Sequence, residues 1–455
     1  MTPRAVNRGV SAVSGWLTTE ERQYAPFVAA AIAFGLLVGF PLGLTVAMAR
    51  ALESSLDGRL PQLLQVHGHV QLFGWFGLFV MGMGYRLVAR FTAVKGRYDW
   101  IAPATLLAVA SGLLLRSIGQ TFAENGVFAA MFGLAGALEF SGVALFVAVV
   151  LRALLIGRPD EFGYKPFFAA GVIWLAAAML LNAYLGFVAA RESDPILPAG
   201  RSAVVAFLLL YGFVSMFVFA VSIRTYPIFF GRERARPSVV TAGLLTVNTG
   251  IAIYAATSLW LTYERSDILR SFQSAGFLAA GAGLLMMVVA AGVFGGEPHR
   301  LRESARRNMR FVQSGYAWLA LAAILQVYAG ATALIDDRPV HALYVDAVRH
   351  FIAIGFLTTV TIGMAFLVMP ALAMRRLARR SARRVAVALL ALLHGAAAAR
   401  GIGSLVAHEG RFSDGYWAMS AGGVLAIAAI ALFVAYVLRS PEEPAGEEIA
   451  LTERR

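Results

Sequence analysis

Residues 65–91 read QVHGHVQLFGWFGLFVMGMGYRLVARF, an apolar run in which no acidic or basic side chain lies between two histidines and Arg86. A hydrocarbon core of about 30 Å requires about 20 apolar residues of helix. The run is this long, and its length distinguishes it from the short alternating strands of an outer-membrane barrel. It therefore predicts a membrane-spanning helix that His67 and His69 open.

The same pattern recurs along the whole chain. Its 455 residues are 59% hydrophobic and 14% charged, with a mean hydropathy of +0.70, whereas soluble proteins are about 25% charged. The runs long enough to span a membrane are 25–50, 66–90, 100–118, 126–152, 166–190, 202–226, 238–263, 271–295, 311–335, 343–370, 382–406 and 416–439. Because backbone polar groups must pair within the lipid, the sequence predicts an all-α integral membrane protein, a bundle of about twelve transmembrane helices.

Basic residues predict the orientation of the bundle. Of the 39 Lys and Arg residues, 28 lie on the side of the N-terminus and 11 on the other. Since basic residues collect in cytoplasmic segments, both termini are expected inside. The expected parts are a cytoplasmic N-terminal segment (1–24), a single polytopic membrane domain (25–440) and a cytoplasmic disordered tail (441–455). Residues 1–24 have no apolar core, which argues against a cleaved signal peptide.

The composition also restricts partners and cofactors. The net charge of +13 comes largely from short cytoplasmic connectors, so we expect contact with anionic membrane lipid and none with nucleic acid. The chain has no cysteine, which excludes disulfides, iron–sulfur clusters and covalently attached c-type haem. A metal must therefore be held by His, Met, Tyr or carboxylate groups, and imidazole suits copper, iron and zinc.

The histidines are concentrated on the predicted outer side. Only His299 lies on the cytoplasmic side, and the other six lie outside or in the outer half of the spans: His67, His69, His341, His350, His394 and His408. Helix bundles commonly build haem or metal sites from side chains on facing helices. The pattern indicates a haem or copper site near the outer face, with His67, His69, His350 and His394 as candidate ligands.

The spacing of the first two histidines restricts their roles. Helical residues two positions apart point about 200° away from each other. His67 and His69 are therefore expected to serve different partners. A histidine near a membrane boundary is also common without any metal, so a structural role for the pair stays open.

Two ionisable groups lie deep in the apolar runs. His394 must find a partner or stay neutral in the membrane, as ligand or as structural hydrogen-bonding group. Glu139 is expected to be paired or protonated, because an ionised acid there costs about 3 kcal/mol. It is either part of a proton relay or a hydrogen-bonded structural carboxyl group.

Several arginines lie near the ends of the spans. Arg116, Arg349 and Arg400 are placed to bind carboxylates such as haem propionates, or to reach lipid phosphates instead. Arg224 closes the sixth span on the inner side, where a membrane-anchoring role is the simpler interpretation. Pro227 is expected to stop that helix, because proline lacks an N–H group.

Three segments together resemble the NnrS family, twelve-span bacterial inner-membrane proteins that contain haem and copper and are associated with the response to nitric oxide. The opening of the second span is similar at His67, His69, Phe73 and Gly74. The end of the sixth span is similar at Arg224, Pro227 and Phe229. The late element is similar at His350, Gly355, Thr359, Thr361 and Gly363.

The resemblance implies haem b and copper as cofactors, nitric oxide or an iron–nitrosyl species as partner, and a site near the periplasmic face. His67, His69, His350 and His394 would be the ligands, with Arg349 or Arg400 near the propionates. The chain departs from the family at Val70 and Gln71, where the family usually has Glu-Met, and in the stretch AFLVMPALAMRRL at 365–377, which suggests a divergent branch.

Two alternative functions stay open. A catalytic subunit of the haem-copper oxidase or nitric oxide reductase type also has about twelve spans. It needs about six metal-ligating histidines that include a pair of adjacent histidines, and this sequence has no such adjacent pair. A metal-free transporter would use Glu139 and His394 to couple protons to a solute. Such transporters often show paired broken helices, and the sequence shows no matched pair.

Overall fold

The computed structural model describes residues 24–94, 100–295, 303–373 and 379–439. This part of the chain contains twelve helices long and apolar enough to cross a membrane, and it contains no strand. The predicted all-α fold is therefore confirmed. The predicted segment 1–24, except for its last residue, and the predicted tail 441–455 lie outside the described residues, as does His299.

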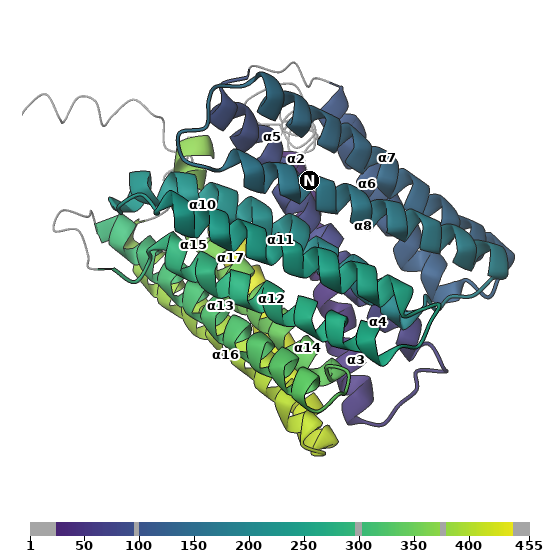
Figure 1. Cartoon of the computed structure of the whole chain (residues 1–455). Coiled ribbons are helices and arrows are strands. Elements are labelled where there is room, and N and C mark those ends of the chain that lie inside the picture. Colours follow the sequence, from purple (N-terminus) through teal and green to yellow (C-terminus); the bar gives the residue numbers. More distant parts are fainter. Residues whose placement is uncertain (1–23, 95–99, 296–302, 374–378, 440–455) are drawn as a thin grey trace, which may run out of the picture.

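Within the described ranges, the helices follow one another through short connectors (Figure 1). The first six spans are built from α2 (Tyr24–Phe34), η2 (Gly35–Gly39) and α3 (Phe40–Ala51); α4 (Leu60–His69), η3 (Val70–Gly77) and α5 (Leu78–Thr92); α6 (Ile101–Gly119) with η4 (Gln120–Phe122); α7 (Gly126–Ile156); α8 (Lys165–Glu192); and α9 (Ala199–Phe207), η5 (Leu208–Val214) and α10 (Ser215–Phe230). The other six are α11 (Pro237–Trp260); α12 (Asp267–Ala291); α13 (Glu303–Ile335); α14 (Ala342–His350), η6 (Phe351–Thr358) and α15 (Thr359–Ala373); α16 (Arg379–His408); and α17 (Phe412–Arg439).

Three spans form the centre of the bundle. In the second, sixth and tenth spans, 67%, 83% and 72% of the residues in an apolar 18-residue stretch of the helix are buried. In the other nine described spans the share is 28–50%. The central spans therefore recur every fourth helix. The last span packs against the first, through α17 and α3, so the outer helices close around the centre.

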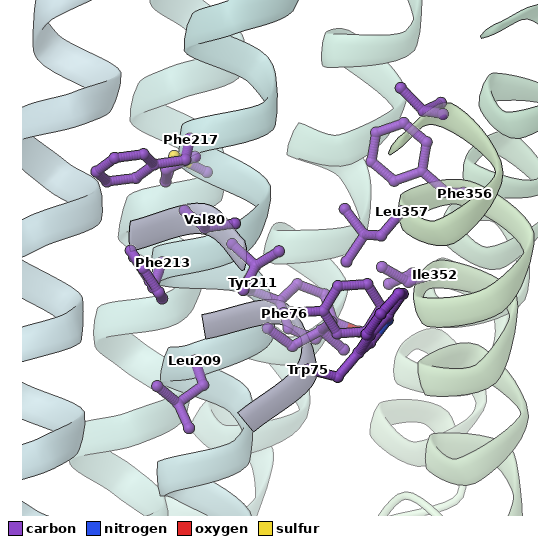
Figure 2. Close-up of a cluster of buried hydrophobic side chains, with 14 of the residues drawn as sticks. Trp75, Phe76, Val80, Leu209, Tyr211, Phe213, Phe217, Ile352, Phe356 and Leu357 are labelled. Carbon is purple, nitrogen blue, oxygen red and sulfur yellow. The ribbon is translucent and has the colours of Figure 1, made fainter. Parts of the chain in front are cut away.

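Each central span contains a π-helical segment, namely η3, η5 or η6. A fourth, η2, interrupts the first span. Figure 2 shows Trp75 and Phe76 of η3 between Tyr211 of η5 and Ile352 of η6, within one buried apolar cluster. π-Helical turns are rare and occur frequently at functional sites. Their concentration on the central spans therefore indicates where function is located.

Two sequence predictions about helix ends were wrong. The second span begins at Leu60, so His67 and His69 lie about two turns inside the helix rather than at its opening; Pro61 in the first turn starts the helix early. The sixth span continues past Pro227 to Phe230 and ends at Gly231, whose φ of 58° is left-handed. A proline in the last turn removes one hydrogen bond, and this loss does not end the helix.

Candidate functional site

A cavity of about 1110 Å³ lies between the central spans and α3. Small-molecule sites usually measure about 300–1,000 Å³, so this cavity is large enough for a sizeable cofactor. Its apolar wall is formed by Phe40, Leu72, Trp75, Phe76, Leu209, Leu210 and Ile354. Its polar lining includes His67, His69, Arg116, Asp346, Arg349, His350 and Arg400. In Figure 1, α3, α4 and α14 lie at the same end of the bundle, which is the predicted outer side.

His67 is held in one tautomer by the backbone of the first span. Its Nδ1 lies 2.8 Å from the carbonyl oxygen of Gly39, the last residue of η2. A carbonyl only accepts, so Nδ1 carries the hydrogen and donates it, and the neutral ring keeps a lone pair on Nε2. The ring packs directly on Gly43 of α3, where any Cβ atom would overlap it. The close approach of α3 and α4 thus orients a potential ligand.

His350 has the same arrangement on the facing helix. Its Nδ1 lies 2.8 Å from the carbonyl oxygen of Asp346, one turn earlier, so Nδ1 donates and Nε2 accepts. Arg400 of α16 donates to that Nε2 from Nη2 over 2.8 Å. The Asp346 carboxylate accepts a 2.5 Å bond from Ser404 and lies 3.9 Å from the Arg400 guanidinium. Two predicted site residues, His350 and Arg400, are therefore in direct contact, and Arg349 lines the same cavity.

His69 serves a different partner from His67, as the spacing predicted. Its Nε2 lies 3.1 and 3.0 Å from the two carboxylate oxygens of Glu139 on α7. Asn182 of α8 donates to Glu139 Oε2 over 2.9 Å, and its own oxygen accepts from Arg116 of α6. All four side chains are at most 6% exposed. We call His69, Arg116, Glu139 and Asn182 the buried quartet, in which Glu139 is hydrogen-bonded to His69 and Asn182.

His394 and Arg224 lie away from the cavity. His394 accepts a 2.7 Å hydrogen bond at Nδ1 from the indole of Trp318 and stacks on that ring. It is not among the described residues that line the cavity. Arg224 packs over the rings of Phe91, Phe162 and Tyr164 near the opposite, predicted inner, end of the bundle. The structure therefore does not bring these two predicted residues to the other candidates.

The aromatic group around Arg224 is a structural anchor. The Tyr164 hydroxyl donates to the carbonyl oxygen of Phe91 over 2.9 Å, which ties α5 to the start of α8. Burial raises the pKa of Tyr164, nearby Asp160 raises it further, and Arg224 lowers it. The phenol therefore stays protonated and keeps donating at neutral pH. Arg224 contacts aromatic faces here, a more specific role than the membrane anchoring expected from the sequence.

Sequence reasoning missed four functional partners, namely Asp346, Asn182, Ser404 and Trp318. Asp346 could have been found, because it lies one helical turn before His350. Asn182 could also have been noticed as an isolated amide within an apolar run. Ser404 and Trp318 contact their partners across 58 and 76 residues of chain, so no local pattern indicates them.

The four predicted metal ligands do not form one cluster. In the described ranges, no three or more His, Asp or Glu side chains are close enough together to hold one metal ion. His67 and His350 share the cavity, whereas His69 is bonded to Glu139 and His394 to Trp318. His67 and His350 are therefore the strongest ligand candidates.

No family model and no curated protein matches the sequence, so the resemblance to the NnrS family stays a prediction. Among solved structures, a haem-copper terminal oxidase dimer studied by cryo-electron microscopy is similar to this chain. The TM-score is 0.66 at 12% identity, and the match covers 93% of this chain and 85% of the other. The chain is thus a multi-pass membrane protein whose fold is similar to that of a haem-copper terminal oxidase.

Proposed function

We propose that the chain is a haem-binding protein of the bacterial inner membrane that takes part in the response to nitric oxide. One observation carries the haem assignment. His67 and His350 come from two central spans, line one cavity, and each donate Nδ1–H to a backbone carbonyl. Metal-ligating histidines almost always use the other ring nitrogen in this way, because the hydrogen bond fixes the tautomer and raises the basicity of the ligating nitrogen.

The cavity fits haem b in size and chemistry. Its wall of Trp, Phe and Leu side chains suits a flat apolar macrocycle, and its volume suits a ligand of that size. Arg349 and Arg400 supply guanidinium groups for propionate carboxylates, which arginine binds well. Since the chain has no cysteine, the haem would be held without covalent attachment.

The protein groups have distinct tasks at this site. His67 and His350 would hold the haem iron through ring nitrogens, and a bound haem would supply gas binding and one-electron transfer. Arg400 would leave His350 Nε2 when that nitrogen ligates a metal, while Asp346 keeps the guanidinium close. Trp75 and Phe76 exclude water from the apolar side of the cavity.

The role in nitric oxide response and the presence of copper rest on the resemblance to the NnrS family. The haem-copper oxidase fold is compatible with both cofactors. Copper has less support than haem from the side chains, because His69 and His394 are bonded to other partners. We propose copper only as a second cofactor of the same outer half of the bundle.

Haem binding by the two histidines predicts a clear difference among variants. His67→Gln and His350→Gln should each reduce the haem-to-protein ratio by at least about tenfold, because each removes a direct ligand. Removing only the group that hydrogen-bonds to a ligand already lowers metal affinity by about 10–100-fold. Visible spectra of the detergent-purified protein, oxidised and dithionite-reduced, measure this ratio. Added nitric oxide should shift the Soret band of the wild-type protein.

His394→Gln is the matched control, since it removes a half-buried histidine outside the cavity and should keep the wild-type haem content. A wild-type protein without a chromophore, after expression with adequate haem, would contradict the proposal. Equal haem content in all three variants would contradict the ligand assignment.

The fold favours one second candidate, a catalytic subunit of the haem-copper oxidase or nitric oxide reductase type. Electrode measurements of oxygen and nitric oxide consumption by the reduced protein distinguish it from a binding protein, because only a catalyst consumes the gas beyond one equivalent. The proton-coupled transporter has weaker support, since Glu139 and His394 have separate partners.

A further inference from the structure

A second pair of histidines lies at the outer rim of the cavity. His341 immediately precedes α14, and His408 is the last residue of α16. Their Nδ1 atoms are 3.1 Å apart and their ring centroids 4.4 Å apart. Val340, Ala342 and Leu343, the neighbours of His341, line the cavity. Neither histidine is needed for the haem site proposed above.

The hydrogen bonds around the pair locate its lone pairs. The backbone N–H of Leu343 points to His341 Nδ1 over 3.3 Å, so His341 acts as the N-cap of α14 and its Nδ1 carries a lone pair. His408 Nδ1 therefore donates the one hydrogen shared between the rings.

The distance between the two nitrogens matches a metal chelate. Metal–imidazole bonds of about 2.0–2.1 Å place two ligating nitrogens about 2.9 Å apart at a right angle and about 3.3–3.4 Å apart in a tetrahedron. The observed 3.1 Å lies between these values. The rings would need little movement to hold one ion, because Tyr344 packs at 4.6 Å against His408 and supports it.

We propose that His341 and His408 form a binding site for a divalent transition-metal ion, with Cu²⁺ bound most tightly. Imidazole nitrogens suit copper and zinc, and Cu²⁺ is the tightest-binding divalent ion of the first transition series. The ion takes the place of the shared hydrogen, and the Leu343 N–H gives up its 3.3 Å bond to His341 Nδ1. His408 moves the shared hydrogen from Nδ1 to Nε2, and no net proton is released. Water completes the coordination on the exposed side of His341.

A copper titration of the full-length protein tests the site. The protein carries a tag without histidine, is treated with chelator, and is titrated with Cu²⁺ against a competing chelator. The wild-type protein should show a paramagnetic resonance spectrum with coupling to two imidazole nitrogens. His341→Gln and His408→Gln should each weaken Cu²⁺ binding by about 100-fold or more, because each removes a ligand itself. Removing only a group that hydrogen-bonds to a ligand weakens metal binding by about 10–100-fold.

His394→Gln is the matched control, since it removes a histidine of α16, the helix that also carries His408, and lies outside the cavity. It should keep this Cu²⁺ site. Wild-type affinity in both rim variants would overturn the proposal, as would loss of the site in His394→Gln alone. The wild-type spectrum tests the site without any variant, because a signal that lacks nitrogen coupling would also overturn it. None of these outcomes depends on haem content, so the two proposals can fail separately.

Discussion

The buried quartet joins four consecutive spans through their side chains. His69, Arg116, Glu139 and Asn182 come from the second to fifth spans, and all are almost fully buried. Glu139 accepts from His69 and Asn182, and Asn182 in turn accepts from Arg116. Asn182 bridges Arg116 and Glu139, the one basic and the one acidic side chain of the quartet. Their opposite charges allow both side chains to lie inside the bundle.

Glu139→Gln should destabilise the protein by about 3–5 kcal/mol, the usual cost of removing one partner from a buried charge pair. The carboxylate accepts from two donors, whereas glutamine offers one oxygen and turns its NH₂ group towards the other donor. Unfolding in detergent, followed by tryptophan fluorescence, measures the change.

The double variant Glu139→Gln with Arg116→Gln is the control for this prediction. It should lose less stability than the sum of the single variants, because neither charge is left alone. Strictly additive losses would show that the two charges do not interact.

At the residue scale, the sequence predicted which side chains matter better than it predicted their partners. Helical geometry alone predicts that His67 and His69 point in different directions and contact different partners. In the structure His67 contacts Gly39 and His69 contacts Glu139. The partners were not predictable, because Gly39 is 28 residues from His67 and Glu139 is 70 residues from His69. Only tertiary packing brings such residues together.

At the element scale, the three central π segments occupy equivalent places in their spans. The residues directly before them are His69, Phe207 and His350. Two of the three positions thus carry a histidine and the third an aromatic ring, which stacks on Tyr211 and Tyr254. Hydropathy cannot predict such segments, because it records that a run is apolar and not how its backbone hydrogen bonds are shifted. The polar site therefore lies beside helical irregularities that the sequence did not show.

The contact between α3 and α4 gives a prediction for glycine. Gly43→Ala should cost about 1–3 kcal/mol through overpacking and lower haem content, because the added Cβ overlaps the His67 ring. Unfolding and visible spectra measure the two effects.

Gly68→Ala is the matched control for stability alone, since Gly68 adjoins His67 and lines the cavity, where an added Cβ has open space. It should be neutral or slightly stabilising, because alanine is favoured over glycine within a helix by about 0.5–1 kcal/mol. Equal losses in both variants would contradict the role assigned to Gly43.

At the scale of the whole molecule, the sequence predicted the number and order of the spans. Long apolar runs are a strong signal, and each predicted run corresponds to an observed helix. Helix ends were less predictable, since turns of mixed polarity such as residues 60–65, with two glutamines and a proline among leucines, extend a helix beyond its apolar part. Which spans lie at the centre was not predicted either, because the central and outer helices are similarly apolar.

The predicted orientation can be tested without background, because the chain has no cysteine. Ser55→Cys lies in the connector after α3, and Ser238→Cys lies at the start of α11; both serines are exposed. A membrane-impermeant maleimide should label the first variant in intact spheroplasts and the second only after lysis. The reverse pattern would show that both termini lie outside.

The buried quartet also sets an order of events during synthesis. His69 enters the membrane first, Glu139 follows 70 residues later, and Asn182 comes a further 43 residues on. At roughly 5–20 residues per second, Glu139 is held for about 2–9 s before its amide partner emerges from the ribosome. During that interval His69 and Arg116 are the quartet members already synthesised, and His69 is the one that bonds Glu139 directly in the folded bundle. The histidine that completes the quartet therefore precedes the acid it bonds into the membrane.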